Sequence, residues 1–161
     1  MSICNWLGIE TVMLSVGQPV TPWQRRVLDG SGNFIMARAD RVGLNLHYAL
    51  YTGIAGDLAE RILGRDHEKW LRAEENGVTH VHVVRIGDEA QSRDLETVLR
   101  YHFVPPLQDQ PRPLHATAFR AAVRIGMRDV AVRALAAHAS AEATRRVGRS
   151  RPHVNALADM W

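Results

Sequence analysis

Cysteine, lysine and long apolar runs are all scarce in this chain of 161 residues. The single cysteine, Cys4, excludes an intramolecular disulfide framework and a cysteine-based zinc site. No apolar run approaches the ~20 residues that a membrane-spanning helix needs. The N-terminus lacks the basic and apolar regions of a signal peptide. We therefore expect a cytoplasmic protein with no membrane partner.

Positive charge comes almost entirely from arginine, because Lys69 is the only lysine. Residues 1–110 carry 11 basic and 14 acidic side chains, whereas residues 111–161 carry 9 basic and 3 acidic ones. A cationic segment attached to a mildly acidic body favours a polyanionic partner such as nucleic acid. A solvated, arginine-rich helix face is the alternative. The length suits one complete hydrophobic core.

Alternating and apolar patterns predict strands over residues 33–38, 44–52 and 78–86, the first two joined as a hairpin. In the second strand, simple alternation places Tyr48 and Tyr51 on opposite faces. Residues 1–29, which contain two proline breaks, are expected only as a packing segment.

Capping and periodicity signals predict helices over residues 57–63, 67–75 and 89–102, and again from residue 115 onward. Together these elements predict an α+β fold: a small mixed three-stranded sheet flanked by helices, with a helical C-terminal extension.

One stretch carries the clearest chemical signal. The strand ending near Tyr51 runs into a turn spaced by Gly53 and Gly56, and the following helix carries Arg61. This arrangement places a tyrosine hydroxyl and a guanidinium on one side of a tight bend. A guanidinium can bind a phosphate through two parallel hydrogen bonds, so the pairing suits a phosphodiester.

Further motifs extend this pattern. Gly32-Asn33-Phe34 starts the preceding strand, and Tyr51-Thr52-Gly53 ends the next one, with Arg61 ten residues after Tyr51. Glu96 lies on a later helix, and Gln108 follows it by twelve residues in a Pro-Pro-Leu-Gln segment. This ordered set resembles the GIY-YIG nuclease superfamily over roughly residues 30–110.

The resemblance implies a DNA endonuclease that uses Mg²⁺ (or Mn²⁺) and no small-molecule cofactor. It assigns Glu96 to the metal and Arg61 to the charge of the transition state. Tyr51 would orient or deprotonate the attacking water. The remaining implied site residues are Phe34 (at the position of the family's first tyrosine), His67 and Gln108. Residues 1–110 would form the GIY-YIG-like domain, and residues 111–161 a basic helical extension.

Two departures from the family pattern support a second interpretation. Phe34 lacks the hydroxyl of the family's first tyrosine, and Gln108 replaces an asparagine. The alternative is therefore a catalytically degenerate module that binds nucleic acid or another protein. Structural roles also remain open: Tyr51 as a packing residue, and Glu96 as the partner of Arg100 in a helix-surface ion pair.

Arginines and histidines supply the last candidate sites. Arg120, Arg124 and Arg128 recur every four residues, so they share a helix face that could hold DNA phosphates, with Arg65 as a further contact. His80 and His82 share a strand face, a geometry that can bind a transition metal. No nearby carboxylate or cysteine completes that ligand set, so we interpret them as structural strand residues.

Overall fold

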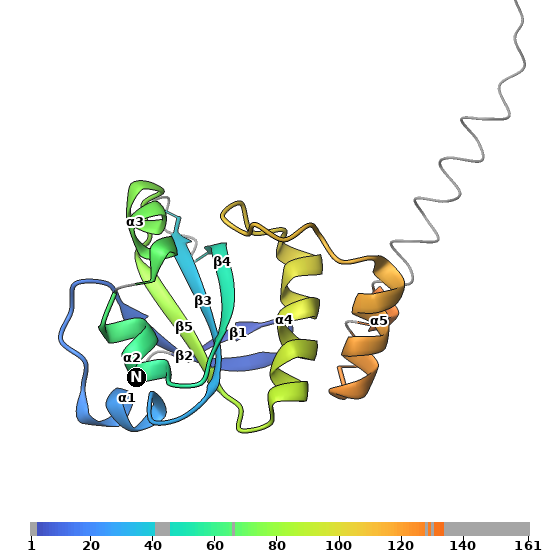
Figure 1. The fold of residues 1–161 in the computed structure, drawn as a ribbon, viewed down its shortest axis with the longest axis horizontal. Helices are drawn as coiled ribbons and strands as arrows, with labels where there is room; N and C mark the ends of the chain where they lie inside the picture. Colours follow the sequence, from blue (N-terminus) through green and yellow to red (C-terminus); the bar gives the residue numbers. More distant parts are fainter. Residues whose placement is uncertain (1–2, 41–45, 66, 128, 130, 134–161) are drawn as a thin grey trace, which may run out of the picture.

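One antiparallel β-sheet of five strands forms the centre of the protein, with helices on both of its faces (Figure 1). The computed structural model describes residues 3–40, 46–65, 67–127, 129 and 131–133. The strands are β1 (Ile3–Trp6), β2 (Ile9–Ser15), β3 (Gly32–Ala39), β4 (His47–Ala55) and β5 (His80–Arg85). They lie in the order β1-β2-β5-β3-β4, and every neighbouring pair is antiparallel.

The expected α+β class is confirmed. The sheet has five strands instead of the expected three, because residues 3–15 add two, and it is antiparallel instead of mixed. The β1–β2 hairpin turns at Leu7 and Gly8, whose φ angles are 56° and 83°. A leucine rarely adopts this conformation, so the sequence gives little warning of a turn there. The sheet is not mixed, because β4 and β5 lie on opposite sides of β3 and each pairs antiparallel with it.

Five helices have defined bounds within the described part of the chain, and those predicted over residues 57–63, 67–75 and 89–102 are confirmed. The five are α1 (Pro22–Val27), α2 (Leu58–Leu63), α3 (Glu68–Glu75), α4 (Glu89–Phe103) and α5 (His115–Arg124). The helix predicted from residue 115 onward is present as far as Arg124, and residues 134–161 of the expected extension lie outside the described part of the chain. Asp57 caps α2 by accepting from the Glu60 amide at 2.9 Å, as its position predicted. Across the described residues, no helix has the length and apolar content to cross a membrane.

Two apolar layers hold the sheet between helices. On one face, Phe34 and Met36 of β3 pack with Leu58 of α2 and Trp70 of α3. On the other face, the alternate β3 side chains pack against α4, and α5 covers the outer side of α4 (Figure 1). Burial of the apolar side chains between these layers is the main stabilising contribution.

A β-bulge in β4 changes which way Tyr51 points. Met36 pairs with Tyr51 but Ala37 pairs with Ala49, so Leu50 is an extra residue in β4. The bulge reverses the alternation, and Tyr51 joins Tyr48 on the face that also carries Met36. The expectation that the two tyrosines lie on opposite faces is therefore wrong. Tyr48 remains 50% exposed.

Candidate functional site

Three rings gather beside the edge strand β4: those of Phe34, Tyr51 and His67. The ring centres of Tyr51 and His67 lie 5.5 Å apart, and those of Phe34 and Tyr51 lie 6.0 Å apart. Phe34 is only 1% exposed, whereas Tyr51 and His67 are partly exposed. The structure thus brings together three predicted site residues, of which the first and the last are 33 positions apart in the chain.

Gly53 allows this close packing. It lies within β4, not in the turn where it was expected. A β-carbon at this position would come within 2.7 Å of Phe34 Cζ and 3.0 Å of Tyr51 Cε1. Gly32 is constrained in the same way, because a β-carbon there would overlap the Val84 carbonyl oxygen of β5. Packing therefore accounts for the glycines of both tripeptides.

Arg61 and His67 line one pocket of about 380 Å³, together with Gly56, Asp57 and Glu60. Asp57 is the N-cap of α2, so Arg61 lies at the start of the second turn of that helix. The Arg61 carbonyl oxygen accepts a hydrogen bond from the Trp70 indole at 3.2 Å, which ties α2 to α3. His67 is held by its Nδ1, which accepts from the Lys69 amide at 3.0 Å.

Four charged groups act on the Tyr51 hydroxyl. Burial raises its pKa, and the negative charges of Glu96 and Asp109 raise it as well, while Lys69 and Arg61 oppose them. Since the net shift is upward, the phenol is protonated at neutral pH. A protonated phenol can donate a hydrogen bond.

Glu96 lies on α4, partly buried, and burial raises the pKa of its carboxyl group. Arg100, the expected ion-pair partner, donates instead to Gln110 and to the Pro111 carbonyl oxygen, though its charge still partly lowers the Glu96 pKa. Among the described residues, no three His, Cys, Asp or Glu side chains are grouped to hold one ion. A metal at Glu96 would therefore need water and substrate oxygens as its other ligands.

Gln108 binds the edge strand. Its Oε1 accepts from the Thr52 amide at 3.2 Å and from the Thr52 hydroxyl at 3.5 Å. The neighbouring Leu107 amide donates to the Leu50 carbonyl oxygen at 3.0 Å, so the segment after α4 covers part of β4. Gln108 thus binds Thr52, the residue that follows Tyr51 in β4.

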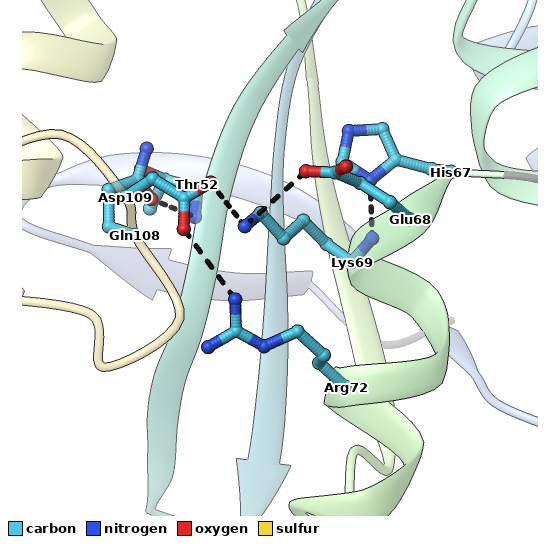
Figure 2. Close-up of polar contacts among 7 residues, drawn as sticks. All are labelled: Thr52, His67, Glu68, Lys69, Arg72, Gln108 and Asp109. Carbon is cyan, nitrogen blue, oxygen red and sulfur yellow. Dashed lines mark hydrogen bonds and ion pairs between the residues drawn. The ribbon is translucent and has the colours of Figure 1, made fainter.

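Lys69 was missed by sequence reasoning. Figure 2 shows its ammonium, from α3, reaching Asp109 on the segment after α4, with Glu68 Oε1 at 3.5 Å on the other side. Arg72 Nη1 lies 3.5 Å from the second Asp109 oxygen. Lys69 is 4% exposed. The available signal was that this is the one lysine in a chain that otherwise uses arginine.

The proposed DNA-contacting arginines do not gather at this site. Arg65 forms an ion pair with Glu74 at 3.6 Å and lies over the Trp70 ring. Arg124 binds Asp94 of α4 through two nitrogens, at 2.7 and 2.5 Å. Arg120 is exposed on α5, and Arg128 lies outside the described residues.

Comparison of the chain with protein-family models, with curated proteins and with solved structures gives no match.

Proposed function

We propose that the chain is a Mg²⁺-dependent (or Mn²⁺-dependent) DNA endonuclease of the GIY-YIG type, with the nuclease domain in residues 1–110. One observation carries this proposal: Arg61 and His67 line a single pocket, and His67 packs against Tyr51, whose hydroxyl is influenced by the charge of Glu96. His67 thus links the pocket of Arg61 to the ring of Tyr51, and the Tyr51 hydroxyl is linked electrostatically to Glu96.

The chemistry follows from these groups. Water attacks phosphorus while one P–O ester bond breaks, and negative charge grows on the phosphate oxygens. The attacking water loses a proton to solvent, and the leaving oxygen takes up a proton from solvent. Arg61 stabilises that charge through paired N–H donors. The protonated Tyr51 donates a hydrogen bond to the attacking water or to a phosphate oxygen. His67 packs against its ring, and Gln108 binds Thr52, the next residue of the strand.

Glu96 suits a divalent cation. A partly buried carboxylate with a raised pKa gains from a nearby positive charge, and Mg²⁺ is commonly held by one or two carboxylates with water and phosphate oxygens. Bound there, Mg²⁺ would neutralise charge on the phosphate.

A plasmid-nicking assay with Mg²⁺ tests the proposal. Arg61→Ala should lower the nicking rate by about 100- to 1,000-fold or more. Glu96→Gln should abolish the nicking that Mg²⁺ stimulates, because it removes the ligand of the metal. Arg61→Lys should also lose most activity, because lysine keeps the charge but not the paired donors.

Matched controls are Arg26→Ala on α1 and Glu10→Gln on β2. Both side chains are exposed and neither lines the pocket, so nicking should be unchanged. Absence of metal-dependent nicking on plain, branched and flapped DNA and on RNA would contradict the enzymatic proposal.

Phe34 favours a second candidate, a catalytically degenerate module that binds nucleic acid or a protein. It brings no hydroxyl to the rings around Tyr51, and it is buried against Gly53. Restoring the hydroxyl with Phe34→Tyr separates the two candidates. A gain of nicking from an inactive parent would assign the wild-type chain to the degenerate class.

DNA binding by the basic extension is best tested by neutralising one of its arginines, because removing the extension would disturb the fold. Ala121 and Ala122 of α5 are buried against Val98 of α4, so cutting the chain at residue 110 would expose the core. Arg120→Gln should weaken DNA binding and its salt dependence if α5 contacts phosphates. Unchanged affinity would remove Arg120 from the interface.

A further inference from the structure

Three histidines meet on the face of the sheet that carries Ala37 and Ala39, opposite to the face that carries Tyr51. His47 belongs to β4, and His80 and His82 belong to β5. Strand β3 runs between them, with Ala37 opposite His80 and Ala39 opposite His47. Since these intervening side chains are single methyl groups, the two outer rings can lean together over β3. The ring centres of His47 and His80 lie 4.6 Å apart.

His82 does not offer a ligand atom. It is fully buried, and both of its ring nitrogens have protein partners: Nδ1 lies 3.2 Å from the Thr11 hydroxyl, and Nε2 lies 2.7 Å from His47 Nδ1. The Thr11 hydroxyl can donate or accept, so this chain of hydrogen bonds can be satisfied with the proton on His47 Nδ1. In that arrangement His47 Nε2 carries a lone pair.

His80 also has a lone pair on Nε2, because of a different set of hydrogen bonds. Its Nδ1 lies 2.8 Å from the Thr79 hydroxyl, which accepts from the Ala39 amide and donates to the Ala37 carbonyl oxygen. With its proton used in that way, the hydroxyl accepts from His80 Nδ1, and the lone pair of His80 is on Nε2. Both imidazoles therefore have a donating Nδ1 held by the protein, which is the usual arrangement of a metal-binding histidine.

We propose that His47 and His80 form a binding site for a divalent transition metal of the Zn²⁺, Ni²⁺ or Cu²⁺ class, each through Nε2. Metal–imidazole bonds of about 2 Å place the centres of two rings on one ion about 5 Å apart, close to the separation of His47 and His80. His82 and Thr79 act as outer partners that orient the two ligands. Because no group of three His, Cys, Asp or Glu ligands occurs among the described residues, water or an external ligand completes the coordination.

Titration calorimetry with Zn²⁺, on the full chain without an affinity tag, tests the site. We expect one saturable site, and at least a tenfold loss of affinity in His47→Gln and in His80→Gln. Cu²⁺ bound to the wild-type chain should show an electron paramagnetic resonance spectrum with coupling to two imidazole nitrogens, falling to one in either variant.

His102→Gln and His115→Gln on the helices are the matched controls and should bind as the wild type does. Glu96→Gln should also leave Zn²⁺ affinity unchanged, which keeps this site distinct from the proposed nuclease metal. The proposal is overturned if Zn²⁺ and Cu²⁺ show no saturable binding. It is equally overturned if binding persists in both the His47 and the His80 variants, or depends on Glu96.

Discussion

At the scale of single residues, Gly53 has no room for a side chain. Gly53→Ala should lower the free energy of unfolding by about 1–3 kcal/mol, because the new methyl group meets the buried Phe34 ring. Gly56→Ala is a matched control, since a β-carbon there meets nothing within 4 Å. Urea denaturation of both variants measures the difference. Equal stabilities would show that Phe34 can move aside.

Tyr51 offers a second residue-scale prediction. Glu96 raises the pKa of its hydroxyl, so Glu96→Gln should lower that pKa. Absorbance of the tyrosinate ion, followed as pH is raised, measures the shift, and Tyr51→Phe identifies which of the three tyrosines is responsible. Glu10→Gln serves as the control. If neutralising Glu96 leaves the Tyr51 titration unchanged, the two groups are not electrostatically linked as proposed.

At the scale of elements, the ion pair between Lys69 and Asp109 joins α3 to the segment that carries Gln108. Lys69 lowers the pKa of the Asp109 carboxyl below its ordinary value of about 3.9. A carboxyl group with a lowered pKa contributes stability above its unfolded-state pKa, and the contribution is lost as pH falls through the folded-state value.

Asp109→Asn should therefore lower the melting temperature at pH 7, and the gap between variant and wild type should narrow below about pH 4. Glu75→Gln, an exposed carboxylate on α3, is the control. A gap that stays constant from pH 7 to pH 3 would show that the ion pair contributes nothing. In the nicking assay, the same variant reports whether the position of Gln108 matters for the proposed reaction.

Element boundaries follow from local signals in the sequence. The Asp57 cap predicted the start of α2, and Asn76-Gly77 predicted the end of α3, where Gly77 has a φ of 76°. These signals depend on side chains a few residues apart, so they survive without tertiary information. The β4 bulge has no such signal, because it depends on which residues of β3 pair with β4.

At the scale of the whole molecule, His82 makes stability depend on pH. Burial, and then the charges of His47 and His80, lower the pKa of His82 to about 3. The folded state therefore favours the neutral ring. The contribution of the neutral His82 ring to the free energy of unfolding is fully present above the unfolded-state pKa of about 6.5. It is lost as pH falls toward 3.

The free energy of unfolding of the metal-free protein should thus fall between pH 6 and pH 4, with His82 contributing up to about 1.4 kcal/mol per pH unit. His82→Gln removes this group, so its unfolding free energy should change less steeply over the same range. Denaturation in urea with a chelator present measures both slopes. Identical slopes would show that His82 is not buried neutral in the sheet.

The candidate site was only partly predictable. Tyr51, Arg61, Glu96 and Gln108 were proposed from their spacing, and in the structure Arg61 and His67 line one pocket, with His67 against Tyr51. Lys69 and Asp109, 40 positions apart, were not found, since neither belongs to a local pattern. Arg124, expected to contact phosphates, pairs with Asp94 of α4, a contact between distant segments that no local pattern indicates.

The sequence by itself determined the α+β class, the limits of α2, α3 and α4, and the ordered set of residues from Gly32 to Gln108. Periodicity, caps and spacing act over a few residues and so can be read from the linear chain. Only the tertiary structure decided the five-stranded antiparallel order, the direction of Tyr51 and the meeting of His47 with His80 and His82. These features depend on strand pairing between distant segments, where one extra residue in β4 reverses the face of every side chain after it.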